Sequence, residues 1–164
     1  MVEMSAAQIH LALNHLPVVG VLLAAAVLGL ATITRQGAAR NFGLGLLVFA
    51  GVSALPVYFT GEGAEELVEH RPGVTGALIE RHEDAAARGL AVTLASGAIA
   101  VAALIAVRLQ REHVAQALFR VALVAALGST ALMAQAAHLG GQIRHEELRP
   151  AGAAASQGST ARES

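Results

Sequence analysis

The chain has no cysteine, no tryptophan and no lysine, so all eleven of its cationic side chains are arginines. The absence of cysteine excludes disulfides, thiolate metal sites, covalently attached haem and cysteine nucleophiles. Charged residues make up only 14% of the 164 residues, whereas soluble domains carry about a quarter. The net charge of −1 gives no electrostatic support for a nucleic-acid partner. With 55% hydrophobic residues, the chain has too little polar surface for an ordinary soluble domain.

The sequence does contain four uncharged apolar runs of 19 residues, each flanked by arginine. The runs cover residues 16–34, 42–60, 89–107 and 121–139. At about 1.5 Å per residue, a helix over each run reaches across the hydrocarbon core of a bilayer. We therefore predict an all-α fold, an integral membrane four-helix up-down bundle, as a single domain over residues 1–149. Residues 150–164 are small and polar, which predicts a disordered tail.

The first helix is expected to begin before its apolar run. Ser5 and Gln8 have the spacing of a capping box, which predicts a helix start near Ala6. Glu3 is the only charge ahead of the run, whereas a secretory signal peptide has a positive flank there. We therefore expect this helix to remain in the mature protein.

The connection between the second and third runs is the longest of the three. Glutamates at helical spacing predict a short amphipathic helix with an acidic face, formed by Glu62, Glu65, Glu66 and Glu69. Thr75 is placed to cap the next helix, which would run on into the third span. An acidic face near a helix start is more often solvated than a ligand set.

Charge differs between the two sides of the predicted bundle. The short connections carry five arginines and one glutamate, a charge of +4, and the remaining segments carry six arginines and eleven acids, −5. Arginine-rich short loops favour the cytoplasm. We therefore expect a multi-pass protein of a bacterial inner membrane with both termini outside.

Six of the seven histidines fall on the acidic side of this bundle, and only His113 falls on the other. The six are His10, His15, His70, His82, His138 and His145. Helical rise puts His15 and His138 level with the membrane edge, as an inner layer. It puts His10, His82 and His145 roughly 9–10 Å further out, with Glu83 beside this outer layer.

Span 121–139 also has small residues at every fourth position leading to His138, namely Ala122, Ala126, Thr130 and Ala134. Such a stripe lets helices approach closely and leaves room for a flat macrocycle. The plainer interpretations are that the stripe serves packing and that each histidine hydrogen-bonds at the membrane interface. The one-sided placement of six histidines favours a site over those interpretations.

The ordered motifs resemble a bacterial membrane family known as domain of unknown function 2231. The resemblance covers about residues 8–147 and rests on a His-x4-His-x-Pro opening at residues 10–17. Thr60-Gly61, His82-Glu83 and the His-Leu-Gly-Gly sequence from His138 follow in the same layout. The resemblance implies a four-helix membrane fold and no established reaction.

Imidazole is the common ligand of b-type haem, copper, zinc and iron. We expect His15 and His138 to bind haem b, which the 3% aromatic content disfavours mildly. His10, His82, His145 and Glu83 better suit copper, zinc or iron. Either cofactor would serve electron transfer with a redox partner in the membrane. The alternative is a non-catalytic structural or assembly subunit of a larger membrane complex, and no catalytic motif indicates an enzyme.

Overall fold

The computed structural model describes residues 6–65 and 68–149, and all regular structure in these ranges is helical. The elements are α1 (Ala6–Leu13), α2 (His15–Thr34), α3 (Gly37–Phe59), α4 (Gly61–Glu65), α5 (Gly76–Arg108), α6 (Glu112–Arg144) and the short 3-10 helix η1 (Glu146–Leu148). The prediction of an all-α fold is confirmed for the described residues.

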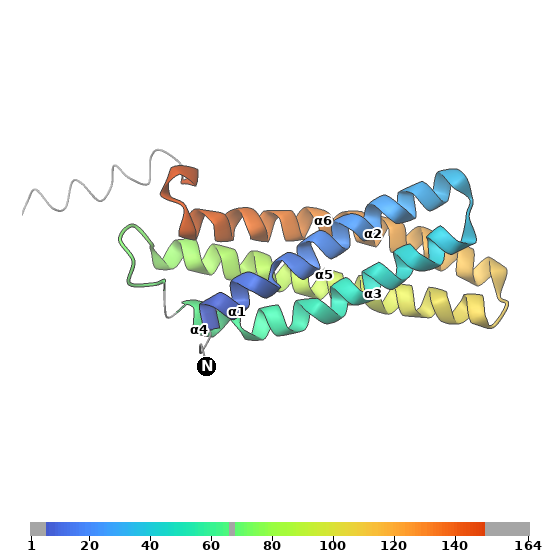
Figure 1. Ribbon diagram of the computed structural model, residues 1–164, viewed down its shortest axis with the longest axis horizontal. Helices are drawn as coiled ribbons and strands as arrows, with labels where there is room; N and C mark the ends of the chain where they lie inside the picture. The colour runs from blue at the N-terminus through green and yellow to red at the C-terminus, as the bar shows by residue number, and fades with distance from the viewer. Residues whose placement is uncertain (1–5, 66–67, 150–164) are drawn as a thin grey trace, which may run out of the picture.

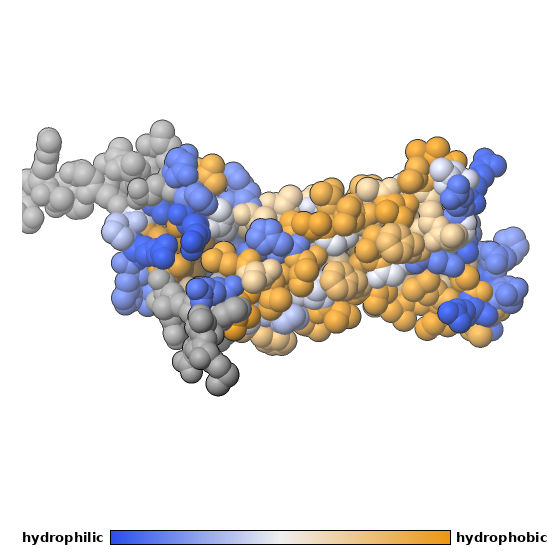
Figure 2. Space-filling model, viewed as in Figure 1, coloured by the Kyte–Doolittle hydropathy of each residue, from blue (hydrophilic) through white to orange (hydrophobic). Residues whose placement is uncertain are grey.

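Four helical stretches are long and apolar enough to cross a membrane: Gln8–Thr34, Gly37–Phe59, Gly76–Arg108 and Glu112–Arg144. They contain the four predicted apolar runs, except that α3 ends at Phe59, one residue early. Figure 2 shows the consequence at the surface, a hydrophobic belt between two hydrophilic ends. The prediction of four apolar helices of membrane-spanning length is therefore confirmed.

The four long helices lie side by side, and each packs against two neighbours in the cyclic order α2, α3, α5, α6. Short connections join α2 to α3 and α5 to α6 at one end of the molecule (Figure 1). We call this the arginine end, after Arg35, Arg40, Arg108, Arg111 and Arg120. The opposite end holds α1, α4 and the described C-terminal residues, and we call it the histidine end.

Small residues allow the helices to pack closely. A Cβ added at Gly43 of α3 would lie 2.8 Å from Leu28 Cδ2 of α2. One added at Gly51 would lie 3.7 Å from the Cα of Gly97, where α3 meets α5. The Ser96 and Ser129 hydroxyls, 3.0 Å apart, hydrogen-bond between α5 and α6. In a lipid bilayer the hydrophobic effect does not draw helices together, and they associate through close backbone contact of this kind.

Proline explains why the first helical stretch is divided. Pro17 has no N–H to donate to Leu13, and its ring crowds that carbonyl, so the helical hydrogen bonding is interrupted between α1 and α2 while Asn14 keeps right-handed helical backbone angles. Residue 6 is the first described residue, so the predicted helix start near Ala6 stays a prediction. Ser5 of the predicted capping box lies outside the described residues.

The connection between α3 and α5 is described only in part. The described part of α4 covers Gly61–Glu65, and residues 66–67 lie outside the described ranges. Beyond them, Glu69 N donates to the carbonyl oxygen of Glu65 at 3.0 Å. The predicted acidic face of Glu62, Glu65, Glu66 and Glu69 therefore stays a prediction. Thr75 caps α5 as predicted, accepting a hydrogen bond from Leu78 N at 3.4 Å. The predicted disordered tail, residues 150–164, lies outside the described ranges.

Candidate functional site

His10 projects from α1 onto the end of α3. Its Nδ1 lies 3.0 Å from the carbonyl oxygen of Val57 and 3.3 Å from Thr60 Oγ1. Val57 is in the last turn of α3, where carbonyls have no backbone N–H partner further along the helix, and Thr60 Oγ1 also donates to its oxygen at 3.0 Å. The imidazole therefore satisfies a helix end and is held in a fixed, partly buried orientation.

His82 is held in the same way between α5 and α6. Its Nδ1 lies 3.0 Å from the carbonyl oxygen of Ala136. The ring rests on Gly140, one turn further along α6, where an added Cβ would be only 3.0 Å from His82 Cε1. The glycine is needed at this position because any side chain would press on the imidazole.

The two hydrogen bonds fix which ring nitrogen is open. A carbonyl oxygen only accepts, so Nδ1–H is the donor in both His10 and His82, and the neutral ring keeps its lone pair on Nε2. In residues 6–65 and 68–149, no side chain hydrogen-bonds to either Nε2. The two imidazoles are also near enough for their charges to interact. A ring anchored through Nδ1 with an open Nε2 is typical of metal-bound histidine.

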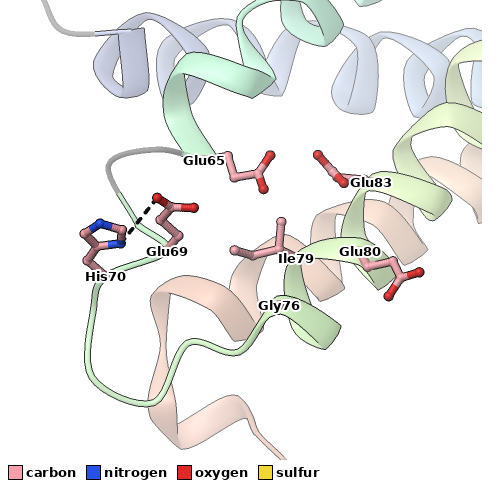
Figure 3. A pocket seen from close by; sticks show the side chains of 7 residues that line it. All are labelled: Glu65, Glu69, His70, Gly76, Ile79, Glu80 and Glu83. Atoms are coloured by element: carbon pink, nitrogen blue, oxygen red, sulfur yellow. Dashed lines mark ion pairs between the residues drawn. The ribbon is translucent and has the colours of Figure 1, made fainter.

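An acidic cavity lies between α4, the turn that follows it and the start of α5, and His82 directly precedes one of its lining residues, Glu83. It has a volume of about 410 Å³, and its lining includes Glu65 of α4 and Glu80 and Glu83 of α5. Glu65 and Glu83 point toward each other in Figure 3 and share a hydrogen bond. That bond, with desolvation and the charges of Glu83 and Glu69, raises the pKa of Glu65. The Glu65 carboxyl is therefore harder to ionise than an isolated glutamate.

The remaining predicted ligands are exposed. His15 Nδ1 lies 3.1 Å from the carbonyl oxygen of Leu11 in its own helical stretch. His138 Nε2 lies 3.0 Å from the side-chain nitrogen of Gln142, so the nitrogen that a haem iron would need is already engaged. His145 Nδ1 lies 3.1 Å from Glu147.

The structure thus brings the predicted residues together only in part. His10 and His82, both of the predicted outer layer, are close enough for their charges to interact, although α1 packs on α2, α3 and α4 rather than on α5. Glu83 follows His82 in α5. His145 instead pairs with Glu147. Within the described ranges, no three His, Asp or Glu side chains gather closely enough to hold a metal ion. Sequence reasoning missed the contacts of His10 and His82 with the backbone, for which it had no signal, and the partnership of Glu65 with Glu83.

Comparison with protein-family models, curated proteins and solved structures finds no match to this chain. The resemblance to domain of unknown function 2231 therefore stays a prediction.

Proposed function

We propose that the chain is a multi-pass protein of a bacterial inner membrane, an up-down bundle with the histidine end and both termini outside. The four long apolar helices and the hydrophobic belt between polar ends support membrane insertion. The five arginines at the opposite end support the orientation, since arginine-rich short loops favour the cytoplasm. The bacterial origin rests on the family resemblance.

We further propose that this protein binds a transition-metal ion through His10 and His82, for electron transfer at the outer face. The observation that carries the proposal is that both rings are anchored through Nδ1 to a backbone carbonyl and keep Nε2 open. Two imidazoles set by the backbone of different helices are oriented before any ligand arrives. Preset ligands bind more tightly because less conformational freedom is lost on binding.

The surroundings favour a metal cation over haem b. Glu65, Glu69, Glu80 and Glu83 give this part of the histidine end a negative potential. That potential attracts a cation and repels the two propionates of haem. The expected haem ligands His15 and His138 are both exposed, and His138 is engaged by Gln142. Copper or iron are the metals that suit imidazole and carry single electrons.

The chain's own residues have distinct parts in this proposal. Val57 and Ala136 hold the imidazoles through their carbonyls. Glu65 and Glu83 supply negative charge at this end of the bundle. A bound copper or iron ion would supply one-electron redox chemistry.

Asparagine variants of the two histidines test the proposal. The amide nitrogen of asparagine lies close to the position of imidazole Nδ1, so His10→Asn and His82→Asn retain a donor for the carbonyl and remove Nε2. The purified protein in detergent is titrated with Cu⁺, Cu²⁺, Fe²⁺, Zn²⁺ and haem, and metal content and absorption spectra are recorded. His113→Asn, at the arginine end, is the matched control.

We expect about one metal ion per chain in the parent and in His113→Asn, and at least tenfold weaker binding in the other two variants. Retention of the metal in both His10→Asn and His82→Asn would refute the site. A b-type spectrum lost in His15→Ala or His138→Ala would establish the haem alternative. A parent protein that folds and binds none of these ligands would leave the structural or assembly subunit as the better hypothesis.

A further inference from the structure

An apolar groove runs between α3 and α5 in the half of the belt nearest the arginine end. Its volume is about 470 Å³, and its lining includes Gly45 and Val48 of α3 and Val101, Leu104 and Ile105 of α5. Arg108, at the last position of α5, borders it, and because almost all of the lining surface is apolar, its charged group lies at the edge of the groove rather than inside it. The groove therefore combines an apolar trough with a cation at one end.

Helix packing explains why the groove opens here. The backbones of α3 and α5 approach each other closely at Gly51 and Gly97. Gly45 lies nearly two turns from Gly51 toward the arginine end, and an added Cβ there would meet no atom within 4 Å. Because Gly45 has no side chain, the space that a larger residue would fill belongs to the groove.

The cation at the end of the groove lacks a protein counter-ion. Neither of the ion pairs in the described residues involves Arg108. The arginine end has five arginines and a single acid, Glu112, so it presents a positive surface. Arg108 follows the third apolar run directly, which places it where lipid headgroups lie.

We propose that this groove binds one anionic phospholipid, with an acyl chain along Val48 and Val101 and the phosphate at Arg108. The proposal rests on the membrane insertion proposed above and is independent of the histidine site. An arginine beside a phosphate makes charge-assisted hydrogen bonds, often two in parallel. A second copy of this chain is a poorer occupant, because it would bury Arg108 against a surface with one acid at this level.

The test uses the full chain purified in mild detergent and native mass spectrometry. Phosphatidylglycerol and phosphatidylcholine with identical acyl chains are added in equal amounts, and the retained lipid per chain is measured. Gly45→Leu fills the groove, and Arg108→Gln removes its charge. The matched controls are Gly128→Leu, where an added Cβ also meets nothing within 4 Å, and Arg120→Gln at the same end.

We expect one phosphatidylglycerol to be retained in preference to phosphatidylcholine, and about a tenfold loss of that preference in Arg108→Gln. Gly45→Leu should lose the bound lipid, while both control variants keep it. Equal retention of the two lipids, or no effect of Arg108→Gln, overturns the lipid site. A dimer peak that Gly45→Leu abolishes overturns it too, since the occupant is then a second copy. A chain soluble without detergent would instead overturn the membrane proposal itself.

Discussion

At the residue scale, His10 and His82 use one ring nitrogen to fix the ring and leave the other open. The carbonyls of Val57 and Ala136 belong to helix backbones, so the rings are aimed by elements that hold their shape. Gly140 also sets the position of the ring, because a Cβ there would press on His82 from 3.0 Å. Variants of this glycine therefore probe the site without removing a ligand.

The first prediction concerns Gly140→Ala. The new Cβ would lie 3.0 Å from His82 Cε1 and 3.3 Å from Nδ1, so the ring must shift from its present position. We expect metal affinity to fall about tenfold, as it does when other residues that orient a metal ligand are changed. Unfolding free energy should change by less than about 1 kcal/mol, since alanine favours the helix by a similar amount.

Metal titration and thermal unfolding of the same preparations check this prediction. Gly141→Ala is the control, because its Cβ would meet Leu148 Cδ1 at 3.4 Å, an ordinary contact. Equal affinities in the two alanine variants would contradict the role given to Gly140.

The second prediction concerns pH and Glu65. Its pKa is raised in the folded protein, chiefly by the hydrogen bond with Glu83, so the folded state binds more protons than the unfolded one. Stability should therefore fall as pH rises from the ordinary glutamate range through the raised pKa. Because Glu65 is largely open to solvent, the effect should be at most about 0.5 kcal/mol. Glu65→Gln retains a donor to Glu83 and should flatten this dependence.

Thermal unfolding in detergent between about pH 4 and pH 8 measures the slope, a range that brackets ordinary glutamate. Glu80→Gln serves as the control, since this exposed side chain also lines the cavity but is not among the causes of the shift in Glu65. A parent profile whose stability rises with pH across that range would contradict the sign.

The residues of the site were only partly predictable from sequence. Rise along the helix gave depth and grouped His15 with His138, but depth says nothing of which way a side chain faces. His10 and His15 are five positions apart, about 140° around a helix, so they cannot share a face. Which of them turns inward depends on the interruption at Asn14 and on the neighbours of α1, which the sequence alone does not show.

At the element scale, α6 shows why a repeat of four misleads over a long helix. Each step of four residues turns the stripe by about 40°, so five members drift to another face. Ala122 and Ala126 are buried, Thr130 is intermediate, and Ala134 and His138 are exposed. The buried face follows a repeat nearer three and a half, at Ala115, Phe119, Ala122, Ala126, Ser129, Met133 and Ala136. The small residues at the start of the stripe are buried where α6 packs, whereas those next to His138 face away from the core.

The third prediction tests the packing of α2 against α3. A Cβ at Gly43 would lie 2.8 Å and 2.9 Å from the Cδ2 and Cγ of Leu28, and 3.2 Å from its backbone nitrogen. Leu28 is fully buried and has no room to retreat. We expect Gly43→Ala to lower the unfolding free energy by about 1–3 kcal/mol, as overpacking does.

Unfolding in mixed micelles, followed by circular dichroism, measures this change. Gly29→Ala is the matched control, because it introduces the same methyl group into α2 with nothing within 4 Å. It should be neutral or stabilising by up to about 1 kcal/mol. Equal losses in both variants would mean that glycine is needed for helix flexibility rather than for contact with Leu28.

At the scale of the whole molecule, the order of the helices places five arginines and one acid at the arginine end and most of the acids at the histidine end. Residues far apart in sequence meet at one end because consecutive long helices alternate in direction (Figure 1). The sequence predicted the four apolar helices, since their length and hydrophobicity follow directly from composition along the chain.

The last prediction is the orientation of the bundle. The chain has no cysteine, so Gln36→Cys and Arg71→Cys each introduce a single thiol at an exposed position. Gln36 lies between α2 and α3 at the arginine end, and Arg71 lies between α4 and α5 at the histidine end. Arginine-rich short loops resist translocation, so Gln36 should be cytoplasmic and Arg71 outside. An impermeant thiol reagent on intact bacterial cells should therefore label Arg71→Cys alone.

Lysed cells provide the internal control, since both variants should then be labelled to the same extent. Labelling of Gln36→Cys alone in intact cells would reverse the bundle and put His10 and His82 in the cytoplasm. A metal carried there would have to exchange electrons with soluble partners of the cell interior. Labelling of both variants in intact cells would mean that the arginine end and the histidine end share one side, so that the helices do not cross the bilayer as an up-down bundle.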